Sequence, residues 1–123
     1  MSSLVLIKPD AIEQKLMGEL ISDFESFGIA GMYLTTMDEA LCAKHYTEHV
    51  SKSFYPGLQA FMCSGRVCAL AITGNVFKVR EVAERIRINM ADLVCNPRNL
   101  VHASDSTAAA KRELDLWFNS RLT

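Results

Sequence analysis

One histidine lies among polar side chains whose types and spacing suit chemistry, in the run Asn99-Leu-Val-His102-Ala-Ser104-Asp105-Ser106. A neutral imidazole is a usable nucleophile near pH 7. With an amide, a hydroxyl and a carboxylate around it, His102 indicates a site that forms and breaks a phosphohistidine. A single motif is only a hypothesis, and the alternative is a structural histidine at the end of a strand.

Glu113 is the second residue of chemical interest. The apolar spacing of residues 107–118 predicts a helix, with Ser106 or Asp105 as its N-cap. Glu113 falls at the edge of the inner face of this helix, where an unpaired carboxylate is expensive to bury. Because His102 lies on the strand just before the helix, we expect the two side chains to be in contact. The alternative is that Glu113 reaches water from the edge of the face.

Three cationic side chains are placed to meet an anion. Lys8 follows the apolar run 4–7, so it lies at the mouth of an inner strand. Arg80 and Arg87 are seven residues apart on one flank of a predicted helix, about 10 Å from each other at 1.5 Å per residue. This spacing would allow both side chains to bind one polyphosphate. The alternative for all three side chains is an ordinary solvated charge.

The hydrophobic pattern predicts strands and helices in alternation. The strands are residues 4–7, 29–37, 67–72 and 100–101, and 67–72 is apolar enough to be central in its sheet. The helical stretches are residues 17–27, 38–49, 58–62, 76–95 and 107–118, with a break at 53–57. This order favours an α/β fold, more narrowly an α+β sandwich of the ferredoxin-like βαββαβ type, with a four-stranded antiparallel sheet and helices on one face.

Length and composition are those of one soluble domain over residues 1–123. The net charge of −1 gives no reason to expect nucleic acid or an anionic membrane as partner. The apolar runs are too short to span a bilayer, and no signal peptide is visible. The cysteines lack the spacing of a zinc site, so we expect reduced thiols in a cytoplasmic protein.

Taken together, these residues resemble the nucleoside diphosphate kinase family. The matching segments are collinear with the family from Leu4 to Phe118. They are Leu6-Ile-Lys8-Pro9-Asp10, Glu39 to His45-Tyr46, Phe54-Tyr55-Pro56-Gly57-Leu58, Ser64-Gly65, Asn99-x-x-His102-x-Ser104-Asp105-Ser106 and Glu113-x-x-x-Trp117-Phe118. The resemblance implies an enzyme that transfers the γ-phosphoryl group from a nucleoside triphosphate to a nucleoside diphosphate by a ping-pong phosphohistidine mechanism.

The resemblance also implies the catalytic roles. His102 is the expected nucleophile, and Glu113 with Ser104 orients its imidazole. Lys8 supplies a point charge near the transferred phosphate and the ribose hydroxyl. Tyr46 donates a hydrogen bond to the phosphate beside His102.

For nucleotide binding, the resemblance implies that Asn99 contacts the sugar hydroxyl and that Phe54 stacks on the base. Stacking tolerates different bases, so we expect a broad substrate range. Magnesium is expected to arrive on the nucleotide and to be held by phosphate oxygens, with Asp105 at most a water-mediated neighbour. No metal site made by protein side chains is expected.

The chain departs from the family between Gly74 and His102, where it is shorter and lacks a threonine that binds phosphate in the family. Arg87 is the best match to the arginine that precedes the histidine strand, Arg85 is a rival, and Arg80 is a substitute for a second arginine. Because the missing loop packs subunits together in the family, we expect a homodimer at least rather than the usual hexamer. A catalytically impaired nucleotide-binding or scaffold domain is the alternative function.

Overall fold

An antiparallel sheet of four strands lies at the centre of the described part of the chain. The computed structural model describes the backbone of residues 1–122 and the side chains of residues 1–118. The strands are β1 (Ser2–Ile7), β2 (Ile29–Thr36), β3 (Arg66–Thr73) and β4 (Val101–Ala103), in the order β2-β3-β1-β4. β1 and β3 are therefore central, and the burial of β3 on both faces explains its uninterrupted apolar run.

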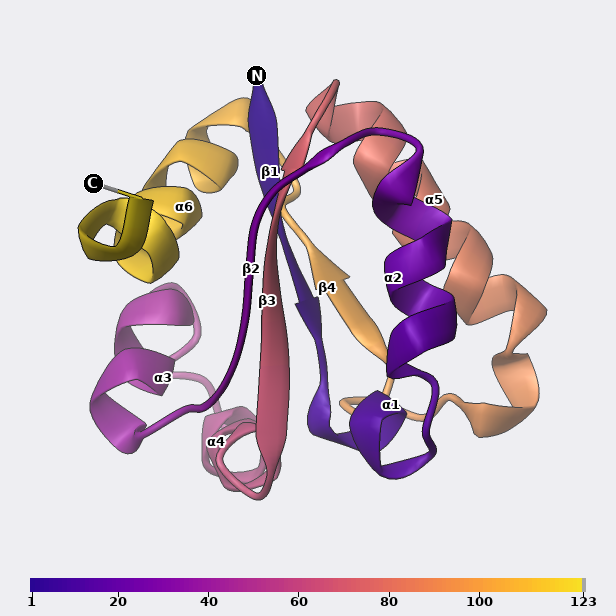
Figure 1. Ribbon diagram of the computed structural model, residues 1–123. Helices are drawn as coiled ribbons and strands as arrows, with labels where there is room; N and C mark the ends of the chain where they lie inside the picture. Colours follow the sequence, from indigo (N-terminus) through magenta and orange to yellow (C-terminus); the bar gives the residue numbers. More distant parts are fainter. Residues whose placement is uncertain (123) are drawn as a thin grey trace.

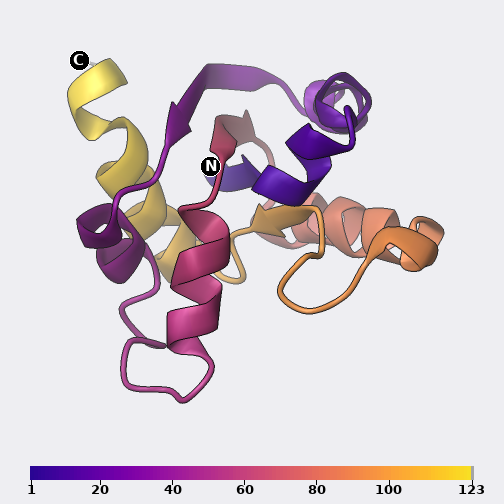
Figure 2. The ribbon, with the colours of Figure 1, turned by 90° about the horizontal axis from the view of Figure 1, so that it is seen from below.

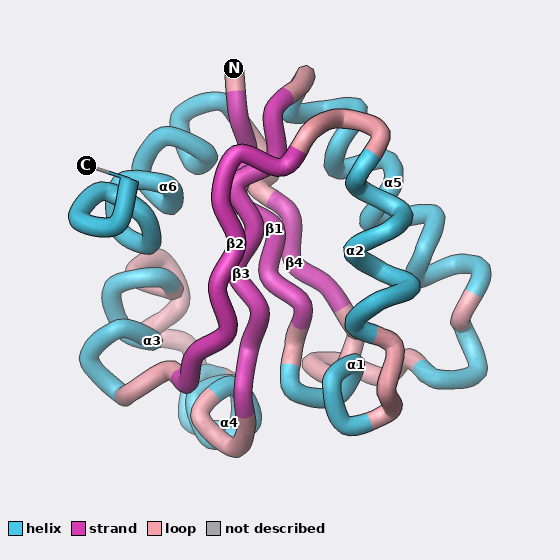
Figure 3. The backbone as a smooth tube through the Cα atoms, viewed as in Figure 1, coloured by secondary structure: helices cyan, strands magenta, loops and turns pink. Residues whose placement is uncertain are grey.

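Helices cover both faces of this sheet (Figure 1). α1 (Pro9–Glu13), α2 (Met17–Glu25) and α5 (Val76–Asn89) lie on one face, and α3 (Glu39–His45), α4 (Tyr55–Met62) and α6 (Thr107–Leu122) lie on the other. Figure 3 shows the strands as a middle layer between the two groups. The β1-α2-β2-β3-α5-β4 core confirms the ferredoxin-like fold. The expectation of helices on one face was wrong, because α3, α4 and α6 cover a second apolar face.

Side chains of β1 alternate between two apolar cores. Val5 and Ile7 pack with α2 and α5, whereas Leu4 and Leu6 pack with α4 and α6. β4 pairs with β1 in a register that sets His102 opposite Leu6. Because residues opposite each other in a sheet point to the same face, His102 points toward the helices α3, α4 and α6.

Several helix boundaries differ from those that the pattern predicts. α1, which begins at Pro9, is not among the predicted helices, although proline suits the first turn of a helix. α4 also has a proline in its first turn and begins at Tyr55, before its predicted start. α3 ends at His45, short of its predicted end. α5 ends at Asn89, and a separate 3₁₀ turn, η1 (Ala91–Leu93), follows it.

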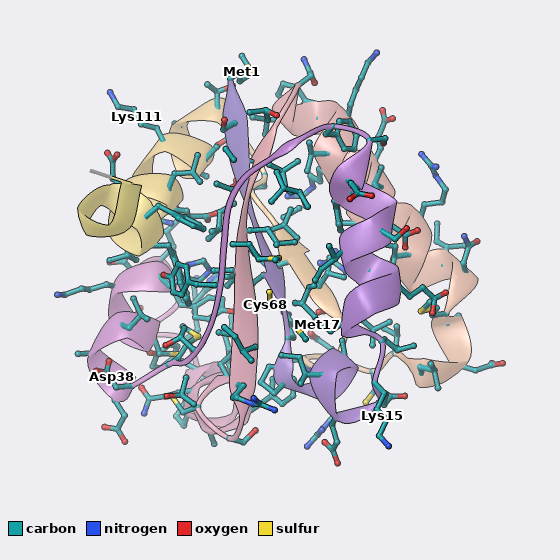
Figure 4. The ribbon with its side chains drawn as sticks, viewed as in Figure 1. Met1, Lys15, Met17, Asp38, Cys68 and Lys111 are labelled. Carbon is teal, nitrogen blue, oxygen red and sulfur yellow. The ribbon has the colours of Figure 1, made fainter. Side chains whose placement is uncertain are left out.

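The cysteines are free thiols, in agreement with the expectation of reduced residues. Cys42 and Cys68 are buried, Cys63 is partly buried and Cys95 is exposed. Cys68 lies on β3 in the interior of the molecule, whereas Lys111 projects outward (Figure 4). Within residues 1–122, no helix has both the length and the apolar character needed to cross a membrane.

Candidate active site

His102 is held by a short chain of hydrogen bonds that leads from the partly buried imidazole to the buried backbone of β1. Its Nε2 atom lies 2.9 Å from Glu113 Oε1, and the Ser104 hydroxyl donates to the same oxygen at 2.8 Å. Ser104 Oγ in turn accepts the backbone N–H of Leu4 at 3.0 Å. Glu113 is only 5% exposed, so it does not reach water from the helix edge. The predicted contact between Glu113 and His102 is confirmed.

The protonation of this chain follows from its donors and acceptors. Burial alone would raise the pKa of Glu113, but hydrogen bonds from His102 and Ser104 and the charge of Arg112 outweigh it and lower that pKa. Glu113 is therefore an ionised acceptor at neutral pH. A neutral His102 must then carry its proton on Nε2, which leaves the lone pair on Nδ1. Nδ1 is the nitrogen available as a nucleophile.

The start of α6 sets the position of Glu113. Ser106 Oγ accepts the N–H of Ala109 at 3.1 Å, which identifies Ser106 as the N-cap. Ala110 and Trp117, three residues before and four residues after Glu113, are buried. Residues at these spacings share one helix face, so Glu113 is carried inward with them.

Lys8 lies at the end of β1 and is tied to the segment before β4. Its Nζ donates to Asn99 Oδ1 at 2.6 Å. Burial, and then the charge of Arg87, lower the pKa of Lys8 from 10.5 to about 8, although Asp10 acts in the opposite direction. Asp10 Oδ2 also accepts the N–H of Leu100 at 3.1 Å, and Leu100 has a φ of 74°. Such a left-handed residue costs about 1–3 kcal/mol, so Asp10 helps to hold the turn that presents Asn99.

A cavity of about 740 Å³ opens beside His102. Phe54 and Phe61, from the start and the last turn of α4, line one wall, and residues 96–99 line another. Figure 2 shows the molecule from below, with α4 and the orange segment that precedes β4, both of which contribute residues to this cavity. Lys8 and His102 also line the cavity. Its volume is in the range of small-molecule sites.

The charges around this cavity have one sign. Among the described residues, the cations Lys8, Arg87 and Arg98 line it, and no carboxylate does. Arg98 was not among the predicted cations. A second, smaller cavity of about 170 Å³ also borders His102 and is lined by charges of both signs. The larger cavity is therefore the one suited to an anionic ligand.

The structure brings most of the predicted site residues together. Those that line the larger cavity are Lys8, Tyr46, Phe54, Arg87, Asn99 and His102. Glu113 and Asp105 line the smaller cavity and not the larger one, and Ser104 is fully buried.

Arg80 and Arg85 line neither cavity. Arg80 pairs with Glu84 at 3.3 Å on the surface, and Arg85 is exposed. The expected joint grip of Arg80 and Arg87 on one ligand is not found, because α5 reaches the larger cavity only with its last turn. There, Arg87 Nη2 donates to the carbonyl oxygen of Val101.

Tyr46 lines both cavities beside His102. Its hydroxyl oxygen is buried and has no hydrogen-bond partner among the described residues. Burial raises the pKa of Tyr46, so the hydroxyl keeps its proton at neutral pH. An unpaired buried hydroxyl costs about 1–3 kcal/mol, a cost that a ligand acceptor in the cavity would remove.

Sequence reasoning named His45 only within a matching segment and gave it no role, yet its ring packs directly against that of His102. The ring centroids are 4.8 Å apart and the planes are 76° apart. Trp117 Nε1 donates to His45 Nδ1 at 2.9 Å, and an indole N–H can only donate, so this nitrogen is unprotonated. Burial lowers the pKa of His45 well below 6.5, so the ring is neutral. Its place beside Tyr46 at the end of a predicted helix was the available signal.

His45, His102 and Glu113 are the described residues that come nearest to a metal site. Each offers one ligand atom, and these atoms lie within 4.8 Å of one another. However, His102 Nε2 bonds to Glu113, and His45 Nδ1 accepts a hydrogen bond from Trp117. The neutral His45 ring therefore carries its own proton on Nε2 and has no unused lone pair for an ion, so the cluster is better suited to orienting His102.

Comparison with known proteins gives a consistent result. The model of the nucleoside diphosphate kinase family matches residues 1–122. The nucleoside diphosphate kinase of Mycobacterium leprae is 43% identical over 94% of this chain and 95% of its own, and that of Rhodopirellula baltica is 39% identical over 96% and 86%.

Solved structures agree with these relatives. The nucleoside diphosphate kinase of Encephalitozoon cuniculi superimposes with a TM-score of 0.89 and 26% identity, covering 99% of this chain and 91% of its own. The enzyme of Halobacterium salinarum, solved in complex with CDP, has a TM-score of 0.83 and 28% identity, covering 97% and 88%.

Proposed function

The chain belongs to the nucleoside diphosphate kinase family and is a phosphotransferase that acts on nucleotides, and from that premise we propose that His102 carries the phosphoryl group. The observation that carries this proposal is the hydrogen-bonded chain from Ser104 through Glu113 to His102 Nε2, which leaves Nδ1 free beside a cationic cavity. The alternative of a catalytically impaired scaffold is not favoured, because the named relatives are kinases.

The reaction has two half-reactions. In the first, His102 Nδ1 attacks the γ-phosphorus of a nucleoside triphosphate, and the bond from that phosphorus to the bridging oxygen breaks. The nucleoside diphosphate leaves with the electron pair of that bond. In the second, a terminal oxygen of another nucleoside diphosphate attacks the phosphorus, and Nδ1 leaves as the neutral imidazole nitrogen.

Glu113 acts on the charge that develops during transfer. The imidazole becomes more positive as Nδ1 bonds to phosphorus, and the ionised carboxylate stabilises that charge through the Nε2–H bond of 2.9 Å. Ser104 keeps the carboxylate in place by donating to the same oxygen. Both groups are positioned before the nucleotide arrives, so little reorganisation is needed.

We assign the residues of the larger cavity to parts of the nucleotide. Lys8 and Arg87 face the phosphate charge, and the unpaired Tyr46 hydroxyl donates to the phosphate beside His102. Asn99 contacts the sugar. Phe54, 55% exposed, stacks on the base.

A divalent cation accompanies the nucleotide in this family, and we propose that it is magnesium. The donors present fit an ion held by the nucleotide, because no described carboxylate lines the larger cavity. Asp105 lines only the smaller cavity. Magnesium binds phosphate oxygens and keeps several waters, and when bound it neutralises phosphate charge.

We also propose that the chain forms at least a homodimer, through β2. This strand is at the edge of the sheet and exposes Met32 and Leu34, which are 54% and 41% exposed. An edge strand with apolar side chains favours pairing with a second copy. Sedimentation of a Leu34→Glu variant is expected to show monomers, and a dimer in that variant would refute the assignment. A cytoplasmic location stays a prediction.

Labelling tests the central proposal. After brief incubation with γ-labelled ATP and magnesium, we expect acid-labile, alkali-stable label on the protein. The label should be absent from a His102→Ala variant and should be discharged by added GDP. A wild-type protein that binds ATP but takes up no label would refute the phosphohistidine role of His102.

A further inference from the structure

Arg98 is a cation of the larger cavity that the assignments above leave unused. It directly precedes Asn99, in a segment where Cys95 and Arg98 form an isolated β-bridge. The carbon at the centre of its guanidinium lies 5.0 Å from the centroid of the Phe61 ring on α4. Arg98 therefore reaches from one wall of the cavity to the other.

Arg98 is exposed, and the donors of its guanidinium are unused. Within residues 1–118, its side chain forms no ion pair and no hydrogen bond, and it lies over Phe61 in a cation–π contact. The other two cations are already engaged, since Lys8 donates to Asn99 and Arg87 donates to Val101. Arg98 is thus the cation of this cavity with the most unused hydrogen-bonding capacity.

We propose that Arg98 binds the phosphates of the nucleotide that are not transferred. This inference rests on the proposed function and adds a residue that the sequence did not indicate. The contact with Phe61 uses none of the N–H donors of the guanidinium, so these remain for a ligand. That planar edge matches two phosphate oxygens at once, and no described carboxylate in the cavity competes for it.

The position of Arg98 in the chain limits which phosphates it meets. Asn99, the next residue, is assigned to the sugar, and His102 is assigned to the transferred phosphoryl group. The phosphates between these two points are nearest to the segment 96–99, which supplies a wall of the cavity. Arg98 therefore contributes to nucleotide affinity and does not contact the reacting phosphorus.

The test compares two variants with wild type by equilibrium titration with ADP and with adenosine. Arg98→Met keeps an unbranched chain over Phe61 and removes the charge, whereas Arg98→Lys keeps the charge and removes the planar fork. We expect Arg98→Met to raise the Kd for ADP about tenfold, because a hydrogen bond between charged groups is lost. Arg98→Lys should raise the Kd less, because it keeps the charge. The Kd for adenosine should not change. Arg66→Ala, an exposed arginine outside both cavities, should leave both Kd values unchanged.

Two results would overturn the inference. One is an unchanged Kd for ADP in Arg98→Met. The other is an equal loss of affinity for adenosine and ADP, which would mean a purely structural contact. These titrations involve no turnover, so they remain decisive even if the labelling experiment shows no phosphohistidine and the proposed function fails.

Discussion

Glu113→Gln tests the catalytic chain because it keeps the shape of the side chain and removes only its charge. The amide oxygen can still accept bonds from His102 and Ser104, so the folded site should persist. What is lost is the difference between a charged and a neutral acceptor. A hydrogen bond to a charged group contributes about 1.5–3 kcal/mol against about 1 kcal/mol for a neutral one. The difference is about 0.5–2 kcal/mol, and about 1.4 kcal/mol corresponds to a tenfold change in rate, so we expect kcat to fall about 2- to 30-fold.

The expected change in KM is much smaller. Glu113 lines the smaller cavity and not the larger one, so the KM for nucleotide should change by less than about twofold. Rapid-quench measurement of label transfer from γ-labelled ATP to the protein separates the rate of the chemical step from binding. Asp115→Asn is the matched control, because Asp115 is exposed on the same helix and should leave the rate unchanged.

Two outcomes would refute the reasoning about Glu113. A wild-type rate of label transfer in Glu113→Gln would mean that the carboxylate charge does not act on His102. A raised KM with an unchanged kcat would mean that Glu113 belongs to nucleotide binding instead.

Three further predictions concern the surroundings of the site. Because burial lowers the pKa of Lys8 to about 8, its charge is lost as pH rises through that value, so the KM for nucleotide should increase above pH 8. Lys8→Arg should remove this increase. A wild-type KM that stays constant up to pH 9.5 would contradict the prediction. Trp117→Phe removes the donor to neutral His45, so an NMR titration should find the pKa of His45 raised, and an unchanged pKa would refute the assigned tautomer. Ser104→Ala leaves the N–H of Leu4 without its partner and should reduce the free energy of unfolding in urea by about 1–3 kcal/mol, whereas no change would mean that water replaces the hydroxyl.

The contact between His102 and Glu113 could be predicted because Glu113 conflicts with the local pattern. Glu113 interrupts the apolar face of a helix, and a buried carboxylate needs a partner. His102, on the preceding strand, is the nearest candidate by sequence. Lys8 follows a buried strand whose end is tied to the segment before β4, which places it near the same site. For Glu113 and His102 a short-range signal was enough, whereas only the family resemblance placed Lys8 near them. The catalytic roles of these residues stay predictions.

The positions of the other site residues depend on contacts between distant parts of the chain. Arg80 and Arg87 have suitable helical spacing, but the direction of α5 relative to β4 decides that only Arg87 reaches the larger cavity. His45 and Arg98 meet the site through the packing of α3 against α6 and of residues 96–99 opposite α4. No periodicity in the sequence encodes which helices and loops pack against each other. The second layer of helices was missed for the same reason.

The bond between Ser104 and the N–H of Leu4 ties the support of His102 to the backbone of a central strand. Leu4 is fully buried between β3 and β4. Amides at such positions exchange with solvent only when most of the protein opens. Glu113, and through it His102, is therefore anchored in the most protected part of the molecule, while the proposed nucleotide contacts come from turns and helix ends. On heating, the enzyme should lose its affinity for nucleotide before it loses the hydrogen bonds that position His102.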